Sequence, residues 1–171
     1  MKKYSLLLLV TLPLYLQSCI GWGNDDDIIV DLPQNSYEPV IMQRSEFENT
    51  TVLESAPKPI VNSGKIYVKG NFIFINEVNK GFHIINNSDP TNPSNIGFIN
   101  VLGSSDLSIK NDVFYANNAR DLIAFKIDET SETLTLTKRL ENVFPQIWTP
   151  EGPFYYPVED NEIVIDWQLA D

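Results

Sequence analysis

A motif that recurs after 41 residues constrains the fold of this chain more than any other feature of its sequence. The segment KIYVKGNFIFIN (65–76) aligns without a gap with DLSIKNDVFYAN (106–117). Self-similarity at a fixed spacing predicts successive copies of one supersecondary unit. The matched positions keep apolar, lysine or asparagine character: Ile66 with Leu107, Val68 with Ile109, Lys69 with Lys110, Phe72 with Val113, Phe74 with Tyr115, and Asn76 with Asn117.

Each copy predicts a β-hairpin followed by two further strands. Apolar residues alternate with a period of two, and Gly70-Asn71 or Asn111-Asp112 can adopt the positive φ that a two-residue hairpin loop requires. The repeats therefore predict two antiparallel four-stranded sheets, over about residues 64–104 and 105–141. The third and fourth strands are FHIIN (82–86) and GFINV (97–101) in the first copy, and LIAFK (122–126) and LTLTKRL (134–140) in the second.

Four strands in about forty residues are typical of a β-propeller blade. The first copy resembles the LVIVD repeat family, and the second copy matches it more loosely. Asn86 replaces an aspartate of the family pattern, and the second copy lacks the Asp-Pro turn. The resemblance implies export and a blade-like fold, but no defined activity. The matching residues are Val68, Gly70, Asn71, Phe72, Phe74 and Ile75, then Gly81, Phe82, Ile84 and Ile85, then Ser88, Asp89, Pro90, Asn92 and Pro93.

A propeller closes with about four to eight blades, whereas this chain has room for two good repeats. We therefore expect an all-β, incomplete propeller-like fold in one domain over residues 37–171, with two blade-like sheets stacked face to face. Flanking strands are expected to cover the sheet edges, because exposed edges invite aggregation. The candidates are YEPVIM (37–42), TTVLES (50–55) and EIVIDWQL (162–169), the last with Ile163, Ile165, Trp167 and Leu169 on one face.

The N-terminus has the features of a processing segment. Lys2 and Lys3 precede an apolar run that is too short to span a bilayer but long enough for a signal-peptide core. The residues Leu16-Gln17-Ser18-Cys19 resemble the lipobox of bacterial lipoproteins, which implies cleavage after residue 18 and acylation of Cys19. A lone cysteine in an exported chain cannot form an intrachain disulfide, and acylation accounts for it. The membrane is thus an expected partner, through palmitate-type acyl chains on Cys19.

Residues 19–36 predict an acidic tether, since they show neither helical nor strand periodicity. Asp25, Asp26 and Asp27 are open to three interpretations: a solvated charge run, a surface-export signal like that of Bacteroidetes lipoproteins, or a calcium site. The calcium interpretation lacks the spaced acceptors of an EF-hand loop. The expected location is the outer membrane. The periplasmic and the surface face both stay open, with a slight preference for the surface.

The charge balance excludes one class of partner. The chain carries 12 Lys and Arg against 23 Asp and Glu, a formal net charge of -11, and removal of the two lysines before Cys19 leaves 10 against 23, or -13. Nucleic acid is not an expected partner, because its binding needs clustered cations.

His83, the only histidine in the chain, is a weak candidate for catalysis. Alternation places it on the face opposite Phe82 and Ile84, so we expect it at the sheet surface or against a loop. No nucleophile-elbow motif accompanies it, and a catalytic zinc site would need about three protein ligands rich in His or Cys. We therefore predict no catalytic residue, no metal site and no cofactor.

Acidic residues near the C-terminus leave an enzyme as an alternative. A carbohydrate-active hydrolase can use two carboxylates that face each other across a cleft. In a chain this acidic, such a cluster is more typical of solvated loop charge. The acidic residues concerned are Glu151, Glu159, Asp160 and Glu162.

The segment from residue 141 to 158 places aromatic rings among four prolines, without strand or helix periodicity. One interpretation is a binding surface, because large amphipathic rings lose little entropy on contact with a partner. The other, which we prefer, is a cap whose rings enter the core over the open end of the sheets. The candidate binding residues are Trp148, Phe154, Tyr155 and Tyr156.

Three functional hypotheses follow. The first is a non-enzymatic outer-membrane lipoprotein that presents a small β-repeat domain for protein or glycan binding. The second is the carboxylate-dependent hydrolase. The third is a structural module that completes a propeller by association with copies of itself or with a larger partner.

Overall fold

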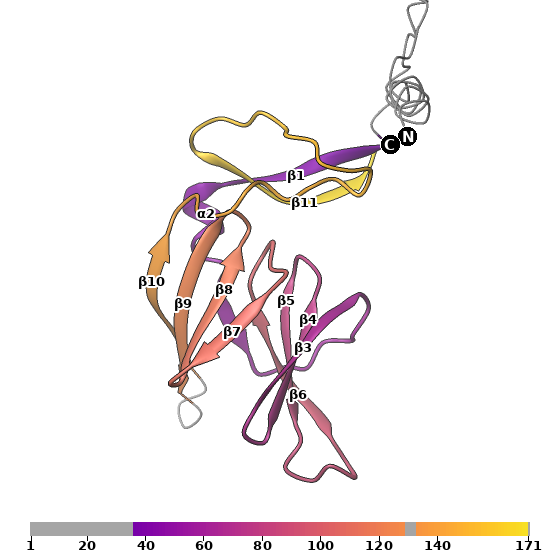
Figure 1. Cartoon of the computed structure of the whole chain (residues 1–171), viewed down its shortest axis with the longest axis vertical. Coiled ribbons are helices and arrows are strands. Elements are labelled where there is room, and N and C mark those ends of the chain that lie inside the picture. Colours follow the sequence, from indigo (N-terminus) through magenta and orange to yellow (C-terminus); the bar gives the residue numbers. More distant parts are fainter. Residues whose placement is uncertain (1–35, 129–132, 171) are drawn as a thin grey trace, which may run out of the picture. The chain divides into compact units, whose positions relative to one another are not determined.

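The computed structural model describes residues 36–128 and 133–170 (Figure 1). The predicted signal peptide, Cys19 and the tether up to residue 35 lie outside the described residues and stay predictions. In the described ranges β-strands are the main secondary structure, as expected, and the helix α2 (Arg44–Phe47) has only four residues. These ranges contain no helix with the length and apolar character needed to cross a bilayer.

The first copy of the repeat forms an antiparallel sheet of five strands, in the order β2-β6-β5-β4-β3. Four of these strands are the predicted meander. The fifth, β2, comes from the segment TTVLES and pairs with β6, so this segment covers a sheet edge as expected. The predicted four-stranded meander is therefore present and is extended by one flanking strand. The strands are β2 (Val52–Glu54), β3 (Ser63–Lys69), β4 (Phe72–Glu77), β5 (Gly81–Asn86) and β6 (Ser94–Asn100).

The second copy forms the predicted four-stranded meander, in the order β10-β9-β8-β7. Its first hairpin closes through Asn111 and Asp112, with φ values of 48° and 62°. The corresponding hairpin of the first copy uses Gly70, at φ 57°. The predicted two-residue loops are thus confirmed at both positions. The strands are β7 (Leu107–Lys110), β8 (Val113–Asn118), β9 (Asp121–Asp128) and β10 (Thr133–Leu140).

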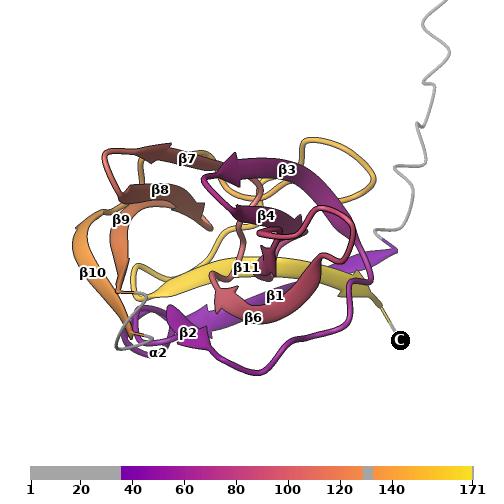
Figure 2. The ribbon, with the colours of Figure 1, turned by 90° about the horizontal axis from the view of Figure 1, so that it is seen from below.

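The two sheets pack face to face, as expected, and enclose the main core between them (Figure 2). Phe74 and Phe114 meet edge to face across this interface, with ring centroids 5.2 Å apart. Each fully buried Phe contributes about 1.5–3 kcal/mol of transfer free energy, so this layer accounts for much of the stability. The buried residues are Phe74, Phe82, Ile84, Ile99 and Val101 from the first copy, and Leu107, Phe114, Ala116, Ile123 and Phe125 from the second.

The two copies turn opposite faces toward this core. Phe74 is buried in it, whereas its repeat equivalent Tyr115 lies on the outer face of the second sheet and is 37% exposed. The second sheet instead buries Phe114, whose equivalent Ile73 faces outward from the first sheet. The first sheet therefore turns one face of the repeat toward the shared core, and the second sheet turns the opposite face. Successive blades of a propeller are related in the same way. The described strands nevertheless do not close into a propeller or barrel.

The remaining flanking strands form a separate antiparallel ribbon of β1 (Tyr37–Gln43) and β11 (Glu162–Leu169). Our expectation that these segments would cover sheet edges is wrong, because they pair with each other. With the short helix α2 (Arg44–Phe47), they bury a second core of Phe47, Ala119, Ile163 and Ile165. Trp167 is also buried, whereas Leu169, at the end of the ribbon, is exposed.

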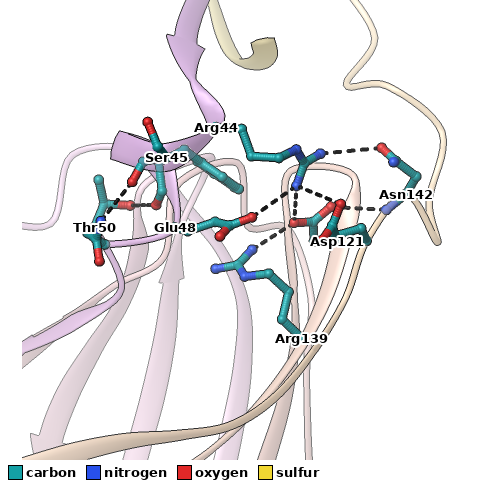
Figure 3. A network of polar contacts seen from close by, with 10 residues as sticks. Arg44, Ser45, Glu48, Thr50, Asp121, Arg139 and Asn142 are labelled. Atoms are coloured by element: carbon teal, nitrogen blue, oxygen red, sulfur yellow. Dashed lines mark hydrogen bonds and ion pairs between the residues drawn. The ribbon is translucent and has the colours of Figure 1, made fainter. Parts of the chain in front are cut away.

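An ion-pair network joins α2 to the second sheet (Figure 3). The carboxylate of Asp121, which is fully buried, accepts hydrogen bonds from Arg44 Nη1 at 2.9 Å and from Arg139 Nη1 at 2.7 Å. Its other oxygen accepts the backbone N–H of Asn142 at 3.0 Å. Burial lowers the pKa of Arg44, but the hydrogen bond to Asp121 and its attraction outweigh burial, so the pKa is raised overall. The network holds the ribbon end and the start of the aromatic segment against β9.

Candidate functional site

A groove of about 640 Å³ lies between the outer face of the second sheet and the first part of the aromatic segment. Its floor comes from β7 and β8, and one wall comes from residues 144–148. The alternation of β8 forms the floor, because Phe114 and Ala116 point into the core while Tyr115 and Asn117 point outward.

Asn117 fixes one end of the floor. Its Oδ1 accepts the backbone N–H groups of Ser105 and Asp106, both at 2.9 Å, and its Nδ2 donates to the carbonyl oxygen of Gly103 at 2.8 Å. The connection between the two sheets is thus tied to the floor of the groove. Asn117 has little hydrogen-bonding capacity left for a ligand.

The wall is held in place by three sets of contacts. Gln146 is buried, and its amide both donates to the carbonyl oxygen of Tyr156, at 2.9 Å, and accepts the backbone N–H of Tyr156, at 2.7 Å. Trp167 Nε1 donates to the carbonyl oxygen of Ile147 at 2.9 Å, and the N–H of Phe144 donates to the carbonyl oxygen of Arg120 at 2.9 Å. A wall fixed in this way keeps its shape before a ligand arrives.

Three aromatic rings line the groove. Trp148 is 63% exposed, and Tyr115 and Phe144 also present accessible rings. The preferred cap interpretation is therefore wrong for Phe144 and Trp148, the two of these rings that belong to the segment 141–158. The backbone of the segment packs onto the protein through Gln146 and Ile147, while the large side chains stay at the surface.

The four candidate binding residues do not form one site. Trp148 lines the groove, whereas Phe154, Tyr155 and Tyr156 do not belong to its lining. Phe154 and Tyr155 are exposed elsewhere, and Tyr156 meets Trp167 edge to face at 6.4 Å. Sequence reasoning did not name Tyr115 as a site residue. Its match to the buried Phe74 concealed it, since only the change of face between the copies exposes the ring.

Asp106 borders the groove, but its carboxylate is already paired with other groups of the protein. Its carboxylate accepts hydrogen bonds from Lys65 Nζ and from the Tyr67 hydroxyl, the latter at 2.5 Å. Burial raises the pKa of Asp106, but the hydrogen bonds from Lys65 and Tyr67 outweigh it, so the pKa lies below its usual value. Burial and the hydrogen bond to Asp106 raise the pKa of Tyr67 to about 12. The groove offers aromatic and apolar surface, and its Asn117 and Asp106 side chains are already hydrogen-bonded within the protein, which suits binding better than proton transfer.

His83 does not lie at the sheet surface. It points away from Phe82 and Ile84, as predicted, but it is 0% exposed because Phe98 packs against its ring and the chain before β3 covers it. It borders a second cavity, of about 400 Å³, whose described lining holds no serine, threonine or cysteine. The described lining of this cavity therefore gives His83 no hydroxyl or thiol group to activate.

The acidic residues that suggested a hydrolase do not meet in a cavity. Glu151 accepts the backbone N–H of Ser36, and Glu162 accepts that of Glu159. Neither these acids nor Asp160 line the groove, the cavity beside His83 or a third cavity of about 200 Å³. Within the described ranges, no group of three or more His, Cys, Asp and Glu side chains is placed to hold a metal ion.

Comparison with known proteins gives no match: no family model fits the chain, and no curated protein or solved structure is significantly similar to it. The resemblance to LVIVD repeats therefore stays a prediction that depends on the residues quoted above.

Proposed function

We propose that this chain is a non-enzymatic outer-membrane lipoprotein, anchored by acyl chains on Cys19, that binds a protein or glycan partner in the groove beside Trp148. The observation that carries the proposal is the combination of three accessible rings with a wall already fixed by hydrogen bonds. The lipobox and the apolar run before it support the anchor.

The shape and chemistry of the groove suit an extended ligand. Trp148 and Tyr115 can stack on a sugar face or on apolar peptide side chains, with little loss of side-chain entropy. Asn117 and Asp106 already use their polar atoms within the protein. Affinity is therefore expected to come mainly from ring contacts rather than from a buried ion pair.

The hydrolase alternative receives no specific support. Glu77 and Asp166 both border the cavity beside His83, but their carboxylates are occupied. Glu77 accepts two backbone N–H groups and pairs with His83, and Asp166 accepts Asn79 Nδ2 at 2.8 Å. The pKa of Glu77 is lowered overall, whereas a glycosidase needs an acid with a raised pKa.

Binding in the groove can be tested with a matched pair of variants. The natural chain, Trp148→Ala and Phe154→Ala would be applied to an array of bacterial oligosaccharides. A photo-reactive amino acid at position 148 would report protein partners in cells. We expect a ligand that Trp148→Ala weakens at least about tenfold and Phe154→Ala leaves unchanged, because a binding ring contributes about 2 kcal/mol or more. Binding that is equal in all three proteins would contradict a role for the groove.

The anchor is tested separately. Radioactive palmitate should label the natural chain and leave Cys19→Ala unlabelled. An unlabelled natural chain would remove the membrane assignment while leaving the binding test valid. Protease treatment of intact cells would then distinguish the surface from the periplasmic face.

A further inference from the structure

The third cavity, of about 200 Å³, lies between the two sheets at the end away from the ribbon of β1 and β11 (Figure 1). Both copies of the repeat supply phenylalanine rings to it: Phe72 and Phe74 come from the first copy, and Phe114 comes from the second. Ile84 and Ile127 add aliphatic surface. None of its described lining residues belongs to the groove beside Trp148. We call this space the inter-sheet cavity.

Gly97 helps to explain why this space stays unfilled. It pairs with Ile84 across β5 and β6, and paired residues of neighbouring strands share a face, so position 97 faces the core as Ile84 does. A Cβ atom at position 97 would lie only 2.9 Å from the carbonyl oxygen of Glu54. Position 97 therefore needs glycine, and it cannot supply a side chain to fill the space beside Ile84.

The polar residues that border the inter-sheet cavity are already engaged within the protein. Lys69 Nζ pairs with Asp112 at 2.8 Å, and Glu54 Oε1 accepts a hydrogen bond from Lys58 Nζ at 2.8 Å. None of the described lining residues carries a buried polar side-chain atom without a partner. A charged ligand would therefore lose its hydration without gaining a vacant partner. The other polar lining residues, which also have interaction partners, are Ser55 and Asp128.

We propose that the inter-sheet cavity binds one small, uncharged, apolar molecule of about the size of a single aromatic ring. An apolar cavity of about 150 Å³ lined by Leu, Ile and Phe side chains binds benzene or xenon in another protein. Phe74 and Phe114 already meet edge to face, with centroids 5.2 Å apart, so a ligand ring would continue an existing type of contact. Water in such a space finds few polar partners, and its displacement by an apolar group favours binding.

This site is independent of the groove and of the membrane anchor. The groove lies on the outer face of the second sheet and suits an extended ligand, whereas the inter-sheet cavity is small and bounded by both sheets. Its ligand is therefore a separate small molecule, and the two sites can be tested separately.

Toluene and benzoate are a matched pair of probes, because they are similar in size but only benzoate is charged. Thermal unfolding of the full chain in lipid nanodiscs would be followed with each probe, with toluene supplied through the vapour so that its activity is equal in every sample. A ligand that binds only the folded protein raises the midpoint. We expect toluene to raise it by at least about 3 °C, and benzoate to leave it unchanged. No shift with toluene, or an equal or larger shift with benzoate, would overturn the proposal.

Two variants with the same substitution test whether the shift comes from this cavity. Ile127 lines the cavity, whereas Ile109 packs half-buried against the same core and is not among the described lining residues. Ile127→Phe should fill the vacant volume, keep a thermal midpoint at least as high as that of the natural chain, and lose the toluene shift. Ile109→Phe should keep the toluene shift.

Two results with Ile127→Phe would contradict the proposal. Insertion of a larger side chain into a core that is already filled destabilises a protein. An Ile127→Phe protein that does not fold, or that melts below Ile109→Phe, would therefore show that there is no vacant volume. A toluene shift as large in folded Ile127→Phe as in the natural chain would place the probe elsewhere.

Discussion

Glu77 Oε2 lies 3.0 Å from Nε2 of His83, and both side chains are buried on the outer face of the five-stranded sheet. Glu77 also accepts the backbone N–H groups of Val61 and Asn62, at 3.1 and 2.6 Å. Burial raises the pKa of Glu77, but these hydrogen bonds and the interaction with His83 outweigh it, so the pKa is lowered overall. The carboxylate therefore ties the chain before β3 to the end of β4.

Replacement of Glu77 should weaken the fold and its response to acid. Glu77→Gln exchanges a buried carboxylate for an amide that cannot accept all three hydrogen bonds, so we expect a loss of about 1–3 kcal/mol. A lowered folded-state pKa means that the stabilisation is complete above the ordinary value of 4.5 and is lost as the pH falls through the folded-state pKa. Urea unfolding at several pH values below neutrality would measure both effects.

Glu159→Gln is the matched control, because Glu159 is exposed. The natural chain and this control should lose stability together in acid, while Glu77→Gln should show a flatter profile. If the free energy of unfolding of Glu77→Gln depends on pH as that of the natural chain does, the Glu77 carboxylate is not the cause of the loss of stability in acid.

Asp121 should be among the costliest polar residues to replace. Asp121→Asn removes the charge that pairs with Arg44 and Arg139, both mostly buried. Breaking a buried pair on one side costs about 3–5 kcal/mol, because the partner charge is left uncompensated. Unfolding in urea would give the loss, and hydrogen exchange should show faster opening of β1 and β11 than of β8.

Glu48→Gln provides the comparison at the rim of the same network. Glu48 contacts Arg44 at 3.5 Å and is partly exposed, so its loss should cost less than about 1 kcal/mol. Equal effects of the two changes would mean that Asp121 is not the centre of the network.

Tyr67 should lose its proton at a higher pH than an ordinary tyrosine does. Burial and the hydrogen bond to Asp106 raise its pKa to about 12. A raised folded-state pKa means that the stabilisation is present below the ordinary value of 10.0 and is lost as the pH rises through about 12. Absorbance titrations of the natural chain and of Tyr67→Phe should differ by the signal of one tyrosine that ionises near pH 12. A difference that titrates near pH 10.0 would contradict the Tyr67 to Asp106 contact.

Local sequence signals predicted the parts of the fold that depend on local chemistry. Gly70 and the pair Asn111-Asp112 adopt the positive φ that fixes each hairpin, so the meanders follow from their own turns. The pairing of Tyr37 with Leu169 joins the two ends of the domain, and no local pattern encodes such a partner. The ribbon was therefore misplaced at the sheet edges.

Full burial of His83 was not predicted, although contact with a loop was one of the two alternatives given for it and is confirmed. His83 alternates as a surface residue would, and only the chain around Lys58 and Val61, folded over Phe98, removes it from water. In the aromatic segment the opposite error arose: prolines and rings suggested a cap, but buried Gln146 anchors the loop so that Trp148 stays outside. A single buried glutamine is not recognisable from hydrophobic patterning.

Gln146 should control the groove without touching its ligand-facing rings. Gln146→Ala removes two hydrogen bonds to the backbone of Tyr156 and leaves both of its polar groups without that partner. At about 0.5–1.5 kcal/mol for each bond, local opening should increase about tenfold, and hydrogen exchange over residues 144–157 should accelerate by that factor. Gln168→Ala is the control, because exposed Gln168 bonds only Glu38 at the ribbon edge. Any ligand found to require Trp148 should bind Gln146→Ala more weakly and Gln168→Ala normally, since a loosened wall must be ordered again on binding. Unchanged exchange in Gln146→Ala would show that Trp167 and Arg120 hold the wall without it.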